Sequence, residues 1–298
     1  MIRLFDDMKR ELYFGVAPKR VVSLVPSDTF SVAALGCGAA LVGRTDYCEL
    51  PVDVVAKVPS VGGTKNPRLE AIFDLSPDLV IANQEENTKK DLEQLVERGV
   101  KVFVAFPKRA ADGIAHLARL ARVFHVHGDP AVRALLKRGY DVVREAEEAR
   151  ARLTPLTTFC PIWMDPLMTI NGDTFISSML DLAGATNVFA ARERRYPLAA
   201  DLGQAVPLTG DRTAGRDTRY PRVAMAEVVE HAPELVLLPD EPHPFSEADA
   251  DVFRALAIPA SKRAAVVRTG GKDLCWYGAQ TIEGLPRLRA LIDRYRVA

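Results

Sequence analysis

The stretch DPAVRALLKRGYDVVREAEEARARL, residues Asp129–Leu153, decides the fold that we expect for this chain. Asp129 suits the N-cap position of a helix, and Pro130 suits the first helical position, where no backbone N–H is needed. Apolar residues recur at helical spacing between charged ones until Pro155 stops the pattern. At ~1.5 Å per residue the helix would be on the order of 37 Å long. We therefore expect a rigid strut; the alternative is an ordinary surface helix of a single domain.

Short apolar runs alternate with helical patterns on both sides of this stretch. Before it we expect strands at 21–25, 41–45, 78–82 and 100–106, and helices at 29–35 (capped by Ser27), 69–75, 89–98 and 110–124. After it we expect strands at 157–164, 167–170, 235–239 and 264–269, and helices at 174–183 (capped by Asp173), 225–231, 247–256 and 282–295. The segment 199–220 is rich in Gly, Arg and Asp and is expected to be a loop.

Strands that alternate with helices are typical of βαβ units with parallel sheets. The fold class we expect is α/β, with two Rossmann-like α/β lobes bridged by one long backbone helix and a ligand cleft between the lobes. The N-terminal lobe would cover residues 1–128, the backbone helix 129–153 and the C-terminal lobe 154–298.

Composition excludes several function classes. The chain has 298 residues, 48% of them hydrophobic and 26% charged, as in a globular protein. Lys+Arg and Asp+Glu balance at 39 each, so no overall field favours nucleic acid. No run approaches the ~18 apolar residues of a membrane span, and the N-terminus lacks the apolar core of a secretory signal. The four cysteines are scattered without metal-type spacing. We expect a cytoplasmic protein with free thiols, or a periplasmic one if a leader was removed.

The two halves of the chain echo each other. LEAIFDLSPDLVIANQEEN in the first half is answered by AEVVEHAPELVLLPDEPHP in the second. Each is a short helix, then Pro-acid-Leu-Val, a strand, and an acidic loop. Ligands of open α/β sheets bind outside the carboxyl ends of the strands, so these loops are candidate binding elements.

With these stretches, the chain resembles the helical-backbone metal receptor superfamily, the substrate-binding proteins for cobalamin, haem and ferric siderophores. Further similar stretches are RVVSLVPSDTF, LVGRTDYCELP, VGGTKNPR and TINGDTFISSMLDLAGATNVF. The resemblance is greatest to the cobalamin-type branch and its leaderless cytosolic relatives, in which the Trp-Tyr-Gly stretch at 276–278 also recurs. It implies two lobes bridged by one helix, little hinge closure, and a ligand held in the cleft.

The candidate ligand-binding residues all lie just past expected strand ends. They are Tyr47, Thr64, Lys65, Glu85, Glu86, Asn87 and Phe106 in the first half, and Trp163, Asn171, Tyr196, Glu241, His243, Phe245, Trp276 and Tyr277 in the second. Large flat rings suit a planar macrocycle. Packing within a lobe is the alternative for Trp163 and Trp276, and Tyr277, beside Gly278, is expected to be the more exposed.

Two segments are candidates for contact with a metal. Glu85 and Glu86 could face a cationic ligand group or a metal, or form a solvated loop. Glu241 and His243 place a carboxylate and an imidazole two residues apart, and His243 is the candidate axial ligand to cobalt or iron. Enzyme signatures are poor, because no G-x-S-x-G elbow is present. We expect a non-enzymatic protein that needs no cofactor for folding.

The resemblance also implies a test of partner docking. Transport members dock to an ABC permease through a Glu on each lobe, seven residues before the Pro of the Pro-acid-Leu-Val strand. Glu70 fits, since 77 − 70 = 7. The same offset from Pro233 falls on Ala226 (233 − 7 = 226), and Glu227, one position on, is rotated by ~100° around a helix. The sequence therefore argues against permease docking.

Our leading hypothesis is a monomeric binding protein for cobalamin or another chelated metal. It would serve in sequestration, sensing or delivery. One alternative is an ABC-transporter substrate-binding protein whose leader was removed. The other is an enzyme that uses the interlobe cleft on a chelate or small metabolite, which a convergent set of buried titratable groups near Glu85, Glu86 and His243 would favour.

Overall fold

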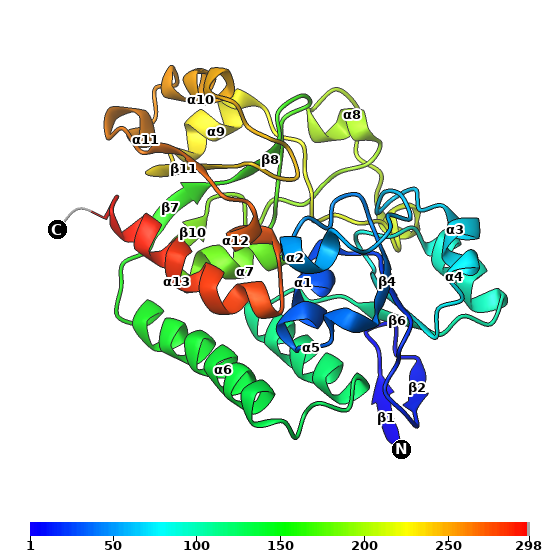
Figure 1. The fold of residues 1–298 in the computed structure, drawn as a ribbon. Coiled ribbons are helices and arrows are strands. Elements are labelled where there is room, and N and C mark those ends of the chain that lie inside the picture. Colours follow the sequence, from blue (N-terminus) through cyan, green and yellow to red (C-terminus); the bar gives the residue numbers. More distant parts are fainter. Residues whose placement is uncertain (297–298) are drawn as a thin grey trace. The chain divides into compact units, whose positions relative to one another are not determined.

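The computed structural model describes residues 1–296 and shows two compact units (Figure 1). Unit 1 comprises Met1–Asp141 and Trp276–Ile282, and unit 2 comprises Val142–Cys275 and the C-terminal residues from Glu283. The expected fold class, α/β with two units built on parallel sheets, is confirmed. The segment Trp276–Ile282 groups with the N-terminal half, a return of the chain that the sequence pattern does not indicate.

Unit 1 is built on a four-stranded sheet in the order β4-β3-β5-β6, with every neighbouring pair parallel. Its strands are β3 (Val21–Ser23), β4 (Leu41–Arg44), β5 (Leu79–Asn83) and β6 (Val102–Ala105). The helical elements between them are α1 (Pro26–Ala34), η1 (Gly38–Ala40), α2 (Val52–Val55), α3 (Leu69–Asp74), α4 (Lys89–Glu97) and α5 (Ala110–Val123). All four strands expected before the backbone helix are therefore present, each within two residues of its expected bounds.

Helices cover both faces of this sheet, which explains why its strands are mainly apolar. On one face Val22, Val80 and Val102 form a buried cluster with Ile72 of α3 and Leu95 of α4. The alternate residues of each strand point to the other face, where Figure 1 shows α1 and α5.

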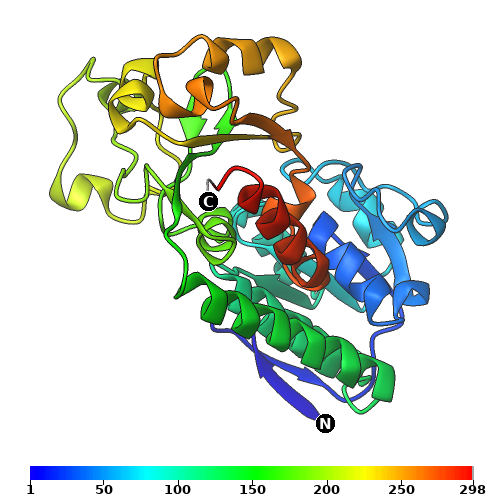
Figure 2. The ribbon, with the colours of Figure 1, turned by 90° about the vertical axis from the view of Figure 1, so that its left-hand side faces the viewer.

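An antiparallel hairpin precedes the sheet and was not expected from the sequence. It consists of β1 (Ile2–Phe5) and β2 (Glu11–Phe14), and it carries the N-terminus in Figures 1 and 2. The backbone N–H of Asp7, in the hairpin turn, donates to the carbonyl of Val104 on β6 at 3.0 Å. The hairpin is thereby attached to the edge strand of the sheet.

The backbone helix α6 (Pro130–Arg150) is one unbroken helix, shown in green in Figure 2. Asp129 caps it as expected, because its carboxylate accepts from the backbone N–H of Ala131 at 2.8 Å. Regular helix ends at Arg150, and residues 151–153 continue in turns. Gly139 permits close packing on α5, since a Cβ there would lie 3.0 Å from the Ile114 side chain. Residues 130–141 group with unit 1, and 142–150 with unit 2.

Unit 2 repeats the parallel architecture with strand order β10-β7-β11-β12. The strands are β7 (Leu156–Phe159), β10 (Ala185–Asn187), β11 (Leu235–Pro239) and β12 (Val266–Thr269), beside an antiparallel pair of β8 (Pro161–Trp163) and β9 (Met168–Thr169). Its helical elements are α7 (Phe175–Leu182), α8 (Leu198–Asp201), η2 (Gly210–Thr213), α9 (Met225–His231), α10 (Glu247–Arg254), α11 (Pro259–Lys262), α12 (Lys272–Cys275) and most of α13 (Ala279–Asp293). The single strand expected at 157–164 is thus divided in two at Cys160.

Two expected helix caps are wrong. Helix α1 begins at Pro26, with Val25 as N-cap and no side-chain cap, so Ser27 lies inside it. Proline already has the helical φ, which explains the earlier start. Helix α7 is capped by Thr174, whose hydroxyl accepts from the N–H of Ser177, and not by Asp173. Within residues 1–296 no helix is long and apolar enough to cross a membrane.

Candidate functional site

The carboxyl edge of the unit 1 sheet gathers the candidate residues of the first half. Asn87 organises these loops: its side chain accepts from the N–H of Asn83 at 2.8 Å and donates to the carbonyl of Thr64 at 2.9 Å. Asn83 in turn accepts from the N–H of Glu85 at 2.7 Å, and Lys65 donates to the carbonyl of Glu85. The structure therefore brings Thr64, Lys65, Glu85 and Asn87 together, with Asn83 as a supporting residue that the sequence did not single out.

Three further candidates of unit 1 lie at the surface or partly buried. Tyr47 is 62% exposed, and Phe106, directly after β6, is half-buried. Glu86 is exposed, but many protein atoms surround its carboxylate and reduce its hydration, which raises its pKa. Lys65 opposes this shift, and the like charge of Glu85 adds to it. Glu86 would thus release its proton at a higher pH than an ordinary glutamate.

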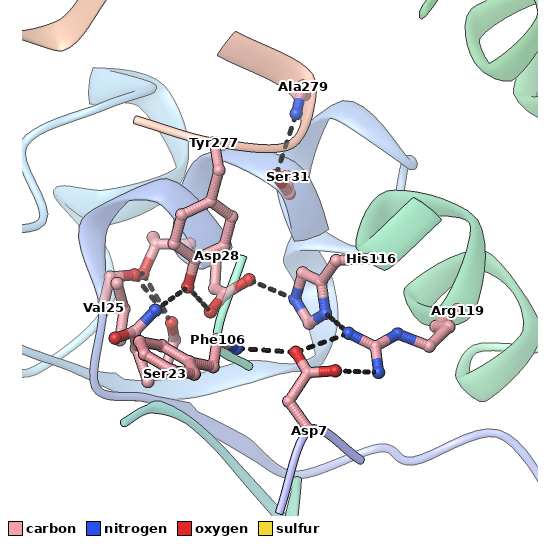
Figure 3. Close-up of polar contacts among 12 residues, drawn as sticks. Asp7, Ser23, Val25, Asp28, Ser31, Phe106, His116, Arg119, Tyr277 and Ala279 are labelled. Atoms are coloured by element: carbon pink, nitrogen blue, oxygen red, sulfur yellow. Dashed lines mark hydrogen bonds and ion pairs between the residues drawn. The ribbon is translucent and has the colours of Figure 1, made fainter. Parts of the chain in front are cut away.

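Beneath these loops lies a buried polar network that the sequence did not predict (Figure 3). Asp28 and His116 are both fully buried, and their Oδ1 and Nε2 atoms are 2.7 Å apart. Tyr277 donates its hydroxyl proton to the second carboxylate oxygen of Asp28 at 2.7 Å and accepts from the amide of Asn83 at 3.2 Å. Arg119 donates to His116 Nδ1 at 3.3 Å. An arginine cannot accept, so Nδ1 carries no proton and Nε2–H donates to Asp28.

A second carboxylate continues the network. Asp7 receives two parallel hydrogen bonds from the Arg119 guanidinium, at 2.7 and 2.8 Å, and a third from the backbone N–H of Phe106 at 2.6 Å. Burial alone would raise the pKa of Asp7, but Arg119 and Phe106 outweigh it and hold the pKa below its ordinary value. The network therefore joins the turn after β1, helix α5 and the loop after β6.

The chemistry of this network is structural. Burial raises the pKa of Tyr277 well above its ordinary value, and the Asp28 carboxylate adds to the effect, so the phenol stays protonated. No surface of Asp28 or His116 is open to a substrate. The available sequence signal was His116 and Arg119, three apart on one face of α5. Asp28, the partner of His116, is 88 residues away from it in the chain, and Asp7, the partner of Arg119, is 112 residues away, which no local pattern indicates.

The network also fixes the Trp-Tyr-Gly stretch inside unit 1. Trp276 and Tyr277 are each only 5% exposed, so the expectation that Tyr277 is exposed is wrong. The Trp276 ring packs edge-on against Phe30 at 6.1 Å. Gly278 has φ +75°, and a Cβ there would lie 2.4 Å from the Ser31 hydroxyl oxygen, so glycine is needed at this turn. Direct ligand contact by Trp276 and Tyr277 stays a prediction.

In unit 2 an aromatic row forms beside β8. The rings of Trp163 and His243 are 5.3 Å apart, and those of His243 and Phe245 are 4.6 Å apart. Trp163 is 43% exposed and its indole N–H donates to the carbonyl of Asp165 at 2.9 Å, whereas Phe245 is buried. Trp163 is thus the broad exposed aromatic surface of the row; its ring packs against His243, which packs against the buried Phe245.

Asn171 and Glu241 are held by their own loops. Asn171 is 6% exposed, and its side chain accepts from the N–H of Asp173 at 2.9 Å. Glu241 lies against Gly271, where a Cβ would come within 2.4 Å of the glutamate side chain. Both residues therefore shape the edge of the unit 2 sheet.

His243 is the candidate metal ligand. Its Nε2 lies 3.8 Å from a carboxylate oxygen of Asp249, so one ring nitrogen already faces an acid. Among residues 1–296, no group of three His, Cys, Asp or Glu side chains could hold a bare metal ion. A role as axial ligand to a metal that arrives already chelated stays a prediction.

Tyr196 lies apart from the aromatic row, in an arginine-rich loop that follows β10. Its hydroxyl donates to the carbonyl of Asp217 at 2.8 Å. A cavity of about 370 Å³ is lined by the segment 191–196 and by Leu208, Thr213 and Thr218. The expectation of an irregular loop at 199–220 is confirmed in outline, because only α8 and η2 interrupt it.

The two possible docking positions differ as the sequence predicted. Glu70 is the second residue of α3, its side chain is 75% exposed, and it pairs with Arg98 at 2.9 Å. The second residue of the equivalent helix α9 is Ala226, which is exposed. Glu227 is occupied: it accepts from the N–H of Ala224 at 2.9 Å and from Arg192 at 3.1 Å. Only unit 1 thus presents an exposed glutamate at this position.

The chain belongs to the periplasmic binding protein family, whose model matches residues 21–237. Among curated relatives, a vitamin B12-binding protein of Photorhabdus laumondii is 31% identical over 201 residues, which is 66% of this chain and 70% of that protein. A vitamin B12-binding protein of Yersinia pestis is 30% identical over 181 residues, which is 61% of this chain and 64% of that protein. The chain thus aligns with about two thirds of the length of these relatives.

Solved structures share the fold over nearly the whole chain. The periplasmic vitamin B12 binding protein of Vibrio cholerae superposes with a TM-score of 0.73 at 18% identity, covering 94% of this chain and 98% of that one. The periplasmic heme-binding protein of Roseiflexus sp. RS-1 gives a TM-score of 0.73 at 18% identity, covering 95% of this chain and 100% of that one. The family match over residues 21–237 and the vitamin B12-binding relatives confirm the expected superfamily, and the solved structures share its fold.

Proposed function

We propose that this chain is a non-catalytic binding protein for a metal chelate of the cobalamin or haem type. The observation that carries the proposal is the family match over residues 21–237, together with relatives that are named as vitamin B12-binding proteins. The exposed ring of Trp163, backed by His243, supports it, because a large flat apolar surface suits a planar macrocycle. We assign ligand contacts to the loop residues of unit 1 and to the aromatic row of unit 2.

The test is a titration of the purified chain with cobalamin, haem and a ferric siderophore. Binding is followed by quenching of tryptophan fluorescence and by ligand absorbance. Trp163→Ala should weaken binding of the true ligand by roughly 1–3 kcal/mol, the value of a buried aromatic contact. Tyr140→Ala removes an aromatic residue that is 49% exposed on α6 and should leave affinity unchanged. No binding of any member of the panel would refute the proposed ligand class.

Native mass spectrometry of protein isolated from its own host would identify the ligand directly. A coloured species that leaves the protein on denaturation, with the mass of a corrinoid or a porphyrin, is the expected result. Co-purification of an uncoloured organic metabolite alone would contradict it.

We further propose that the chain does not dock tightly on a two-fold permease. A two-point dock needs an acidic side chain on each unit, and the position equivalent to Glu70 holds Ala226, while Glu227 is occupied by its own helix cap and by Arg192. An arginine left without its acidic partner at such an interface typically costs 2–5 kcal/mol. Ala226→Glu should therefore strengthen any residual binding to a cobalamin-type permease. Submicromolar binding of the unmodified chain, abolished by Glu227→Ala, would overturn this.

Without docking, the role would be sequestration, sensing or delivery in the cytoplasm. The four cysteines form no disulfide, which supports a reducing compartment. Fractionation of the native host tests the location, and recovery from the periplasm would favour the transport alternative.

A further inference from the structure

The cavity of about 370 Å³ in unit 2 has a chemistry that differs from the aromatic row. Its walls include three arginines, Arg192, Arg194 and Arg195, and one acidic residue, Glu193. The lining therefore carries a formal charge of 3 − 1 = +2. The segment around it, residues 191–222, holds seven arginines against four acidic residues. This concentration of arginine stands out in a chain whose overall charge is zero.

Two of these arginines are occupied by internal carboxylates. Arg192 donates to the buried Asp201 at 3.3 Å and to Glu227 at 3.1 Å, and its side chain is 12% exposed. Arg219 forms a two-point bond with Asp217 at 2.8 and 2.6 Å. These pairs hold the loop in place, and their charges are largely neutralised.

Arg194 is different. Its Nε is buried and has no hydrogen-bond partner within residues 1–296. The nearest carboxylate oxygen, on Asp201, lies 4.0 Å away, which is too far for a hydrogen bond. The guanidinium of Arg194 lies 5.4 Å from the centre of the Tyr196 ring, and that of Arg216 lies 4.8 Å from the same ring. Two like charges are thus held close to one aromatic side chain in the cavity wall.

Arg216 and Arg212 add charge without an acid of their own. Arg216 donates to the backbone carbonyl of Arg212 at 3.2 Å, and no carboxylate of the described chain lies within 4.0 Å of either guanidinium. Arg212 and Arg216 are exposed, whereas Arg194 is largely buried. An anion bound near Arg194 and Arg216 would be attracted by both guanidinium groups, and most strongly by the buried one. Arginine is the side chain that binds planar or tetrahedral oxyanions at two points.

We propose that this cavity binds a phosphate group that is carried on a small organic molecule. The arginine-rich wall selects an oxyanion, and the volume is in the range of sites for whole small molecules, so the phosphate belongs to an ester with a larger organic part. Arg194, which lines the cavity, and Arg216, which lies against the Tyr196 ring of the same wall, are the residues that hold the phosphate oxygens. The ester could be the phosphodiester arm of a corrinoid or a free phosphorylated metabolite, and the experiment separates the two.

The experiment is calorimetric titration of the full chain at low ionic strength with ribose 5-phosphate, with ribose as the uncharged control. We expect one site for ribose 5-phosphate and no binding of ribose. Arg194→Gln should weaken binding by about tenfold or more, since a charge-assisted hydrogen bond is lost. Arg216→Gln is the second variant. The Arg216 side chain is exposed, donates to a backbone carbonyl and contacts the Tyr196 ring, so the variant should fold normally and also weaken binding.

Arg254→Gln is the matched control, because Arg254 is an arginine of unit 2 paired with Glu247 and Asp251 on α10, outside the cavity lining. It should leave the affinity for ribose 5-phosphate unchanged. No binding of ribose 5-phosphate by the unmodified chain, or an equal loss in Arg254→Gln and Arg194→Gln, would overturn the site.

A second arm compares cobalamin with cobinamide, which lacks the nucleotide phosphate, and only this arm rests on the proposed function. If the site holds a corrinoid phosphate, Arg194→Gln lowers the affinity for cobalamin and leaves cobinamide unchanged. If it holds a free ester, Arg194→Gln affects ribose 5-phosphate alone. Ribose 5-phosphate binding without binding of any chelate would preserve the site and refute the proposed function; the reverse result would refute the site alone.

Discussion

Replacing Tyr277 by Phe removes one hydroxyl group from the buried network of unit 1 and keeps the aromatic ring. That hydroxyl donates to Asp28 over 2.7 Å and accepts from the amide of Asn83 over 3.2 Å. A lost hydrogen bond to a buried carboxylate costs roughly 1.5–3 kcal/mol, and an amide donor left without its acceptor adds about 1 kcal/mol. We therefore expect Tyr277→Phe to lower the free energy of unfolding of unit 1 by about 2.5–4 kcal/mol.

Urea unfolding followed by tryptophan fluorescence measures this change. The chain has two tryptophans, Trp276 in unit 1 and Trp163 in unit 2, so a Trp163→Phe background leaves Trp276 as the reporter of unit 1. Tyr140→Phe is the control, because Tyr140 is 49% exposed and its replacement should change stability by less than about 0.5 kcal/mol.

The pairing with Asp28 is tested separately by a double-mutant cycle. If Tyr277 and Asp28 act through their mutual hydrogen bond, Tyr277→Phe should cost much less in an Asp28→Asn background than in the parent. A loss below about 0.5 kcal/mol from Tyr277→Phe, or equal losses in both backgrounds, would refute the view that this bond holds the Trp-Tyr-Gly stretch in place.

Three further predictions concern stability and reactivity. Burial raises the pKa of Cys160 to about 12, so this thiol should stay unmodified by a thiol reagent in the native protein and react after unfolding, whereas the partly exposed Cys37 reacts natively. The pKa of Asp7 is held below its ordinary value of 3.8, so its pairing with Arg119 stabilises the fold above that pH and is lost as the pH falls toward the lower native pKa. Asp7→Asn should therefore flatten the loss of stability below pH 3.8. An unchanged dependence of stability on pH in this acid range would contradict the prediction. Gly278→Ala should destabilise unit 1 by at least about 1 kcal/mol, because alanine disfavours the positive φ, and a neutral result in urea unfolding would be inconsistent with the turn described here.

Local patterns predicted the elements whose causes are local. Strand β5 was recognisable because a parallel strand covered on both faces is a continuous apolar run, here LVIA at Leu79–Ala82. Helix α6 was recognisable because its cap Asp129 and its apolar spacing lie within one stretch. Both elements follow from patterns that extend over a few neighbouring residues, so they can be recognised in the sequence. The N-terminal hairpin was missed, since each of its strands contains a charged residue, Arg3 in β1 and Glu11 in β2, and neither is a continuous apolar run.

The candidate site was predicted in part, for a related reason. Strand ends are visible in the sequence, so Thr64, Glu85 and Asn87 could be expected at one edge of a sheet, and they do lie together. The sequence did not indicate which of these residues support the loop and which face solvent. The side-chain amide of Asn87 bonds to the backbone of Asn83 in its own loop and to the backbone of Thr64. The second contact depends on where the segment around Thr64 lies in the fold.

The sequence by itself determined the alternation of strands and helices, the long helix and the position of the edge loops, because each of these follows from propensity, capping and apolar period over a short stretch. Only the tertiary structure decided that Tyr277 is buried against Asp28, 249 residues away in the chain, and that His116 faces the same carboxylate. It also decided which arginines of the 191–222 segment pair with internal carboxylates, as Arg192 and Arg219 do, and that the Nε of Arg194 in the cavity wall has no hydrogen-bond partner within residues 1–296. Pairings of this kind depend on where distant segments meet, and buried polar groups take whichever partner the packed fold places within reach.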